Sequence, residues 1–548
     1  MEIQSMSVSL PLEIILDILM RLNYQDLLTC RRCSRWFCAI IDDDDFLQYK
    51  ISLAISGMVD NPINQTPPTE KLARLENYRN WWMSSSLMDK SWSTDQKLTY
   101  PTHHGPAWEL AGGVLAQSLD FNSIQFVRLP AKMRNITEKT WTTKLPCSHG
   151  DFRIDPVQDL LVIIERPLQA IGTKARLRLL TMSNAEEHPQ SRVHTLEFPC
   201  RGVGNSCYEI RINGPYLGIL STDHRGSCVL TVWQWLTGEI IYRRYGMDQV
   251  SFVFLNDLYL LVALSEDTDF TAEHSHSRSP SPVLNLVSFR PNNVGLWNLR
   301  LPRPDINQVL FDDLELISEP GPLYSPQTTN VSPMFHISDT VEPERLVLLK
   351  MGAISTATFS FLASNIIEIP QKFPLHPMHA MHQSMTMMYV EWDSWAPGCL
   401  IEQPSGWLGH WRSIVFGTKH VFIRKASMDD EDIAADVFVR DFNPRRVRWE
   451  EVQRQQSGRQ TIPDSKSITP FKNDNADNEM KVDLFMRGFF MPVLQYTFTE
   501  KIARSLAYME LCIPRAVSMR DQVILSEDAI VVVKNGGFVS TGFEVHIV

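Results

Sequence analysis

LPLEIILDILMRLNYQDLLTCRRCSRWF, residues 10–37, is a run of short amphipathic segments near the start of the chain. The aliphatic residues of its first part share one face of a helix, and they are Ile14, Ile15, Ile18, Leu19 and Leu22. Glu13, Asp17 and Arg21 recur every fourth residue on another face. This pattern predicts an amphipathic helix of about three turns.

Capping residues predict where the following helices begin. Asn23 followed by Asp26 resembles a capping box for a second helix that carries Leu27 and Leu28. Ser34 is placed to cap a third helix. Several short helices bury too little surface to be stable alone, so part of their apolar surface must meet the rest of the chain or a partner.

Four consecutive aspartates, residues 42–45, come at the end of this third helix. Negative charge is unfavourable at a helix C-terminus and favourable at an N-terminus, so these residues are predicted to begin a fourth helix, FLQYKISLAIS. Gly57 is the expected end of that helix.

The N-terminal segment resembles the F-box. The family pattern begins with Leu-Pro-x-Glu, an aliphatic pair, two variable residues and Ile-Leu. It continues with Leu, then Asp-Leu-Leu, and then an end like Val-Cys-(Lys/Arg)-x-Trp. The residues that fall in step are Leu10, Pro11, Glu13, Ile14, Ile18, Leu19, Leu22, Asp26, Leu27, Cys33 and Trp36. Arg32 departs from the pattern, because the family commonly has an aliphatic residue there.

The resemblance implies that this segment binds a Skp-type adaptor, which links an F-box to a cullin scaffold and so to ubiquitin transfer. It implies an adaptor-binding set of Leu10, Pro11, Glu13, Ile14, Ile18, Leu19, Leu22, Leu27, Leu28, Cys33 and Trp36. The alternative is an N-terminal helical cap that is packed on the larger domain.

Composition limits the classes of function. The 548 residues are 44% hydrophobic, which predicts a multidomain globular protein, and the net charge of -11 argues against binding of nucleic acid. The N-terminus lacks the pattern of a secretory signal, and no apolar run approaches the about 18 residues of a membrane span. Nine scattered cysteines fit a reducing compartment. The expected location is therefore the cytoplasm, the nucleus or both.

The sequence predicts no metal, cofactor or catalytic residues. The cluster Cys30, Cys33 and Cys38 lacks a second cysteine pair at zinc-site spacing, so a structural role is favoured. His376, His379 and His382 lie among methionines that would suit a soft metal, but Pro377 interrupts the helix needed to align them. Motifs for phosphate, dinucleotide or nucleophilic chemistry do not occur in a supporting context.

Residues 58–98 are predicted to connect two domains. A Pro-rich stretch is followed by Thr69 as a helix N-cap. Apolar residues then recur at helical spacing to about Met83, as Leu72, Leu75, Tyr78, Trp81 and Trp82. A helix that bridges the F-box to the following domain is expected, with its aromatic face buried.

From about residue 99 onward the sequence repeats a strand-and-turn pattern. YEIRINGPYLGILSTDHRGSCVLTVWQWLTGEIIYRRYG reads as four strands with an Asn-Gly turn at 213–214. The segment resembles a blade of a WD-repeat-like β-propeller. An F-box followed by such a region resembles the large fungal F-box families that carry a propeller-like C-terminal region. Weaker copies elsewhere predict six or seven blades, with the last strands closing the ring against the first blade. A two-sheet sandwich is the alternative, but the region is too long for one.

Two polar stretches, near 266–282 and 445–481, are predicted to be mobile insertions. Ser279 and Ser281, each before proline, are candidate phosphorylation sites in the first, although an unmodified solvated loop is favoured.

The expected fold class is α+β multidomain. It consists of a helical F-box unit at 1–57, a linker and bridging helix at 58–98, and an all-β propeller-like substrate-binding domain at 99–548. The predicted function is the substrate-recognition subunit of an SCF-type ubiquitin ligase, without catalytic activity of its own and with an unknown client protein. The alternatives are a non-degradative F-box scaffold and a propeller enzyme such as a glycoside hydrolase.

Overall fold

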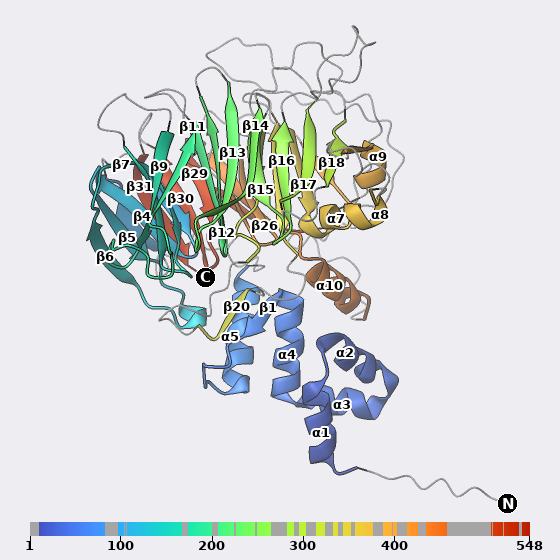
Figure 1. Ribbon diagram of the computed structural model, residues 1–548. Helices are drawn as coiled ribbons and strands as arrows, with labels where there is room; N and C mark the ends of the chain where they lie inside the picture. Colours follow the sequence, from blue (N-terminus) through green and yellow to red (C-terminus); the bar gives the residue numbers. More distant parts are fainter. Residues whose placement is uncertain are drawn as a thin grey trace, which may run out of the picture.

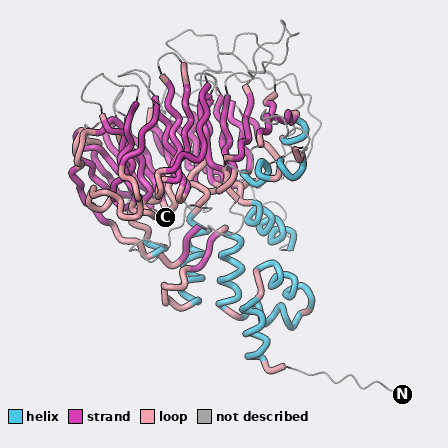
Figure 2. Tube along the Cα trace, viewed as in Figure 1, coloured by secondary structure: helices cyan, strands magenta, loops and turns pink. Residues whose placement is uncertain are grey.

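A ring of β-sheets with helices gathered on one of its faces forms the described part of the chain (Figure 1, Figure 2). The computed structural model describes residues 10–82, 97–103, 105, 107–166, 174–199, 207–223, 226–246, 249–264, 282–289, 295–302, 314–323, 333–337, 344–351, 357–375, 387–396, 398–402, 414–425, 434–456, 506, 508–518, 520–535 and 540–547. None of the helices within these ranges is both long enough and apolar enough to cross a bilayer.

The N-terminal helices begin at the predicted capping residues. Asn23 accepts a hydrogen bond from the amide of Asp26, Ser34 accepts one from the amide of Phe37, and Asp44 accepts one from the amide of Leu47. The fourth helix ends at Gly57, whose φ of 69° suits glycine. The helices are α1 (Leu12–Arg21), α2 (Tyr24–Cys33), α3 (Arg35–Asp43), α4 (Asp45–Ser56) and α5 (Pro68–Trp81).

The all-β region is a propeller of seven blades, which confirms the predicted architecture and settles the blade count. Blades 1 to 3 are regular four-stranded meanders in chain order. They comprise β3 (Trp108–Ala111), β4 (Val114–Asp120), β5 (Ser123–Arg128) and β6 (Lys139–Lys144); β7 (His149–Asp155), β8 (Leu160–Glu165), β9 (Lys174–Thr181) and β10 (Thr195–Pro199); and β11 (Cys207–Asn213), β12 (Tyr216–Thr222), β13 (Cys228–Gln234) and β14 (Glu239–Gly246).

Blades 4 to 6 carry the longer connections. Blade 4 has a fifth, parallel strand that comes from the chain between two strands of blade 5. The strands are β15 (Gln249–Phe254), β16 (Tyr259–Leu264), β17 (Val283–Ser288), β18 (Leu296–Arg300) and β23 (Met387–Val390); β19 (Leu314–Ile317), β21 (Leu346–Met351), β22 (Ala357–Leu362) and β24 (Leu400–Glu402); and β25 (Val415–Phe416), β26 (Lys419–Lys425), β27 (Ala434–Asp441) and β28 (Met509–Ser518). Short helices α7 (Ala363–Ile367), α8 (Ile369–Lys372) and α9 (Trp392–Trp395) lie beside them.

Blade 7 closes the ring with strands from both ends of the propeller sequence. Its strands are β29 (Gln522–Leu525), β30 (Ala529–Asn535), β31 (Ser540–Ile547) and β2 (Lys97–Pro101). The N-terminal strand β2 pairs antiparallel with the C-terminal strand β31, from Lys97 opposite His546 to Pro101 opposite Gly542. The closing strand therefore precedes blade 1 and joins the last blade, and it leaves no open seam in the ring.

The strongest blade pattern in the sequence folds as predicted. Its Asn-Gly turn joins β11 to β12, with Gly214 at a φ of 54°. A side chain there would also collide with Leu323, whose Cβ would lie 2.9 Å from the added Cβ. Both the backbone conformation and the close approach therefore require glycine at this position.

The helices are attached to the propeller by a short sheet and by a shared core. Strand β1 (Met58–Asp60) pairs antiparallel with β20 (Phe335–Ile337), and the Asn61 side chain donates to the carbonyl of Pro333 at 2.8 Å. Buried side chains of α4 and α5 pack in one hydrophobic cluster with residues of the propeller, among them Tyr49, Leu53, Leu75 and Tyr78. The predicted bridging helix is thus α5, and its aromatic side chains are largely buried.

A buried charged cluster lies at this junction. Arg134, in the short helix η2 (Lys132–Arg134), lies 2.7 Å from both Glu527 Oε1 and Asp528 Oδ2, and its Nε donates to the carbonyl of Phe335. The Tyr78 hydroxyl donates to the carbonyl of Glu527 at 2.8 Å. Blades 1 and 7, the β20 strand and helix α5 are therefore held together by one network.

Two local predictions need correction. Residues 445–456, predicted as the start of a mobile insertion, lie in helix α10 (Pro444–Gln456), because Trp449 packs on the N-terminal helices. Thr69 does not cap α5. Pro68 occupies the first turn, and the Thr69 hydroxyl donates to Asp45 at 2.6 Å. Residues 457–481, and residues 266–281 of the other predicted insertion with Ser279 and Ser281, lie outside the described residues.

Candidate functional site

Helices α1, α2 and α3 extend away from the propeller, beyond α4 (Figure 1). Their packing is organised around a small buried core made by one side chain or more from each of the first four helices. This core consists of Leu19, Leu27, Ile41, Leu47, Ile51 and Ile55. An ion pair between Arg31 and Asp42, 2.6 Å apart, links α2 to the end of α3. The hydrogen bond from Arg31 lowers the pKa of Asp42.

A second set of apolar side chains on these helices is left in solvent. We call it the apolar surface, and its members are between 36% and 52% exposed. It consists of Leu10, Leu12, Ile14, Ile18, Met20, Trp36 and Phe46. Soluble proteins rarely leave this many large apolar side chains uncovered on so small a unit. The apolar surface is therefore the candidate site for docking of a partner.

The structure divides the predicted adaptor-binding residues into two groups. Those with exposed side chains are Leu10, Pro11, Glu13, Ile14, Ile18, Cys33 and Trp36, and Leu22 and Leu28 are half-buried. Leu19 and Leu27, however, are only 2% and 0% exposed. Both belong to the core that holds the helices together, and their part in adaptor binding stays a prediction.

Sequence reasoning missed three members of the apolar surface, Leu12, Met20 and Phe46. A signal for the first two was present, because apolar residues cover more of the circumference of α1 than one buried face requires. Phe46 carried no such signal, since only the docking of α4 decides which of its faces is buried. Arg32, where the sequence departs from the F-box pattern, has an exposed side chain and disturbs no packing.

The cysteines of this unit do not form a metal site in the described part of the chain. Cys38 donates to Asp42 at 3.2 Å, and this hydrogen bond raises the pKa of the thiol. Cys33 is exposed and Cys30 is half-buried. Within the described residues, no group of three or more His, Cys, Asp or Glu side chains is placed to hold a metal ion. His376, His379 and His382 lie outside these residues.

Helix α10 reaches from blade 6 to the N-terminal helices. Trp449 packs against their core, and the Arg445 guanidinium lies 5.1 Å from the centre of the Tyr24 ring on α2. At its start, Asn443 donates to the carbonyl of Ile55 at 3.0 Å, and Arg446 donates to the carbonyl of Arg79 at 2.9 Å. These contacts come from far along the chain and fix the orientation of the apolar surface relative to the propeller.

The α10 contact leads to a testable expectation. Replacing Trp449 with alanine should cost about 1–2 kcal/mol of local stability, roughly half of a fully buried Trp→Ala change because Trp449 is only partly buried. Hydrogen exchange at the amides of α2 and α4 would show the loss as faster exchange. The control is Val452→Ala on the same helix, where the side chain is 40% exposed and no change is expected. If the amides of α2 and α4 exchange equally fast in both variants, then Trp449 of α10 does not stabilise the N-terminal helices.

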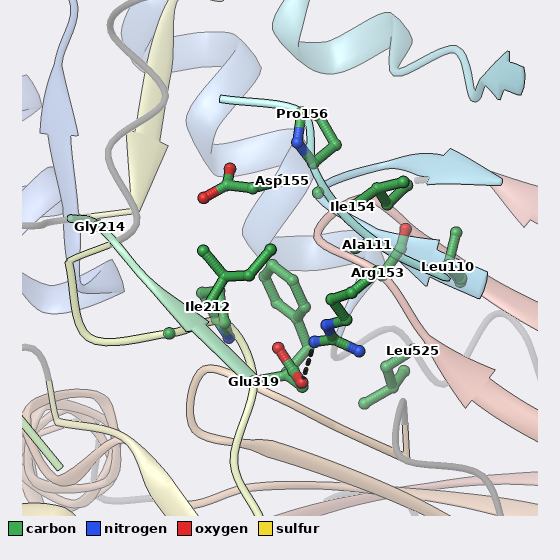
Figure 3. Close-up of a pocket in the computed structure, with 15 residues that line it drawn as sticks. Leu110, Ala111, Arg153, Ile154, Asp155, Pro156, Ile212, Gly214, Glu319 and Leu525 are labelled. Carbon is green, nitrogen blue, oxygen red and sulfur yellow. Dashed lines mark hydrogen bonds and ion pairs between the residues drawn. The ribbon is translucent and has the colours of Figure 1, made fainter. Parts of the chain in front are cut away.

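The centre of the propeller contains a charged pocket where the innermost strands end (Figure 3). Arg153 of β7 lies 2.6 Å from Glu109 of β3 and 2.5 Å from Glu319, which follows β19. Arg211 of β11 pairs with Glu209 at 2.9 Å and with Glu319 at 3.0 Å. The carboxylates are thus engaged by arginines that link blades 1, 2, 3 and 5.

Burial dominates the protonation of the carboxyl groups in and beside this pocket. It raises the pKa of Glu109 to about 7, and the neighbouring Arg153 offsets only part of that effect. Burial also raises the pKa of Asp155, which accepts hydrogen bonds from Gln158 and from the amide of Val157. A carboxyl pair in the central channel was the feature that would have supported a propeller enzyme. Here Arg153 lies between Glu109 and Glu319 and binds both, which is typical of a structural cross-link.

Comparison with known proteins agrees with the division into two parts. Residues 8–54 match the F-box-like family, so the chain carries an F-box-like domain followed by a seven-bladed propeller. No curated protein matches the chain.

Solved structures show only remote likeness. Hydrazine synthase of Kuenenia stuttgartiensis is 10% identical over 47% of this chain and 64% of its own, less than two thirds of that chain, with a TM-score of 0.27. The uncharacterized protein lmo1340 of Listeria monocytogenes EGD-e is 9% identical over 56% and 82%, with a TM-score of 0.23. Oligopeptidase B of Leishmania major is 11% identical over 68% and 58%, with a TM-score of 0.24. At these TM-scores the likeness supports no functional argument.

Proposed function

We propose that this protein is the substrate-recognition subunit of an SCF-type ubiquitin ligase. The observation that carries the proposal is the apolar surface, which lies within the residues that match the F-box-like family. F-box domains generally bind Skp-type adaptors, and such an adaptor would cover these side chains. A cullin scaffold would join through the adaptor, and the propeller would hold the client.

In this role the protein performs no bond chemistry itself. It would accelerate ubiquitin transfer by holding the client close to the charged conjugating enzyme, which raises the client's effective concentration. The units in this assembly are residues 1–57 as the adaptor-binding unit, 58–98 as the connection and 99–548 as the client-binding domain. We place the complex in the cytoplasm, the nucleus or both.

The adaptor-binding residues that we propose are the exposed and half-buried ones. They are Leu10, Pro11, Glu13, Ile14, Ile18, Leu22, Leu28, Cys33 and Trp36, extended by Leu12, Met20 and Phe46. Leu19 and Leu27 belong to the predicted set but are buried. We propose that they position the exposed side chains, because they fill the core on which the helices pack.

The test is co-purification of the full chain with a Skp-type adaptor, wild type against a triple variant with Leu10→Ala, Pro11→Ala and Ile14→Ala. We expect adaptor binding to fall at least about tenfold, since each truncation removes exposed apolar contact area from the proposed interface. Because all three side chains are exposed, the thermal unfolding temperature should change little.

The matched control carries Asp17→Ala and Arg21→Ala, which remove an exposed ion pair from the same helix and should leave binding unchanged. Wild-type protein that fails to bind, or a triple variant that binds equally well, would overturn the proposal. A non-degradative scaffold remains the alternative, and it predicts adaptor binding without any client that accumulates when the protein is removed.

A further inference from the structure

Each blade ends in an outermost strand whose outward backbone groups would pair with any extended chain. Proteins protect such edges with proline, charged side chains (lysine above all), β-bulges, short strands or a covering segment. Six of the seven blades follow this rule in the described residues. Pro199, Pro514 and Pro101 lie in the outer strands β10, β28 and β2, lysines lie at both ends of β6, β24 has three residues, and β23 covers β18.

Strand β14, the outer strand of blade 3, is protected only by its charged residues Glu239, Arg243 and Arg244 and by a register shift in its pairing with β13. It spans eight residues, EIIYRRYG, and contains neither proline nor lysine. Within the described residues its only strand partner is β13. Ile240 is 43% and Tyr245 is 65% exposed, so the edge also presents apolar and aromatic side chains. Figure 1 shows β14 beside β13 on the rim of the ring.

The neighbouring blade shows how an edge of this propeller accepts another strand. Strand β23 adds in parallel to β18, with Leu296 opposite Met387 and Leu299 opposite Val390. At the end of β18, the Arg300 guanidinium stacks 4.8 Å from the Tyr389 ring centre and pairs with Glu391 at 2.7 Å. Backbone pairing together with an arginine that holds an aromatic and an acidic residue is therefore a mode of recognition that this fold already uses.

Strand β14 carries two arginines suited to the same mode. Arg243 donates to the Thr231 hydroxyl at 3.2 Å, and Arg244 donates to the Asn285 amide oxygen at 2.9 Å. Both of these partners are neutral, and within the described residues neither guanidinium forms an ion pair. Each guanidinium has five N–H donors, so most of them are left to bind the carboxylates of an incoming strand.

We propose that β14 is a docking edge for an extended, acidic segment of a partner protein, which adds to blade 3 as a fifth strand. The backbone of the segment pairs with β14, its carboxylates bind Arg243 and Arg244, and its apolar side chains contact Ile240 and Tyr245. The identification of this partner as the client rests on the proposed function, whereas binding of the segment itself does not.

The test uses a fluorescein-labelled peptide, Val-Glu-Glu-Val-Glu-Glu-Tyr-Val, whose neighbouring glutamates point to opposite faces of a strand as Arg243 and Arg244 do. It is titrated with the full-length protein and followed by fluorescence anisotropy. We expect wild-type protein to bind this peptide, and Arg243→Glu to weaken binding about tenfold. A peptide with lysine in place of glutamate should show the reverse preference, binding Arg243→Glu better than wild type. The matched control is Lys144→Glu, which reverses an exposed charge on the outer strand of blade 1 and should have no effect.

Two further arms separate strand addition from simple charge attraction. A peptide with proline at its central valine cannot form the ladder and should lose binding to the wild type. Tyr245→Ala, a change at an exposed position that the fold should tolerate, should weaken binding. Equal binding of the proline peptide, or no effect of both Arg243→Glu and Tyr245→Ala, would overturn the proposal.

The adaptor assay separates the two proposals. If the wild-type protein binds the adaptor but not the peptide, only the proposal of a docking edge at β14 is rejected. A protein that binds the peptide but no adaptor would keep the edge and remove the proposed function.

Discussion

Replacement of Arg134 by methionine is expected to lower the free energy of unfolding by about 3–5 kcal/mol, because it leaves Glu527 and Asp528 buried without their partner. Arg134 is 1% exposed, so bulk water cannot solvate the two carboxylates in place of the guanidinium. Burial already raises the pKa of Asp528 although Arg134 is beside it. Urea unfolding of the full chain measures the loss.

The position of the cluster also predicts where the damage occurs. The network reaches Tyr78 of α5 through the carbonyl of Glu527, and it reaches β20 through the carbonyl of Phe335. Amide hydrogen exchange in α5 and β1 should therefore accelerate more than exchange in blades 3 and 4. The N-terminal helices would lose part of their attachment to the propeller.

Two further variants make this prediction specific. Arg21→Met removes an exposed ion pair with Asp17 and should change stability by less than about 1 kcal/mol. Adding Glu527→Gln and Asp528→Asn to Arg134→Met removes the uncompensated charges and should restore most of the loss. If Arg134→Met costs no more than Arg21→Met, the cluster does not stabilise the junction.

The second large expected effect is a pH dependence of the free energy of unfolding that comes from Glu109. Its pKa is about 7 in the folded protein and 4.5 in a model carboxyl, so the folded state keeps a proton that the unfolded state has released between these values. Stability therefore falls as the pH rises through this window. The change from 4.5 to about 7 corresponds to about 3 kcal/mol.

The measurement is urea unfolding from pH 4.5 to pH 8 for the wild type and for Glu109→Gln, which cannot release a proton. The wild type should lose about 3 kcal/mol relative to the variant across this range. The comparison cancels His420 and His546, whose pKa values are lowered by burial to about 3 and about 4. These two groups act in the opposite direction, because the unfolded state binds their protons first as the pH falls.

Thr140→Ala provides the control, since it alters an exposed, non-titrating residue of blade 1. Its difference from the wild type should be independent of pH. If the Glu109→Gln difference is equally flat, the carboxyl is ionised throughout, and Arg153 compensates fully for its burial.

Local patterns in the sequence were sufficient for much of this fold. A helix cap such as Asn23 or Ser34 bonds to a residue three positions away, and a blade strand pairs with the next strand along the chain. Both patterns are therefore recognisable in a short stretch of sequence. The F-box-like helices and the blade pattern were therefore predictable. The pattern in α1 did not show which of its apolar residues would be buried, because Ile14 and Leu19 are equally apolar and only packing against α4 distinguishes them.

By itself, then, the sequence determined the class of protein: short capped helices with excess apolar surface, followed by a repeated β unit. Only the tertiary structure decided how these parts meet. The closure of β2 on β31, the return of α10 to the helices and the pairing of Arg134 with Asp528 join residues hundreds of positions apart. The physical reason is that burial of charges and apolar side chains depends on the assembled chain, and no short sequence window contains both partners.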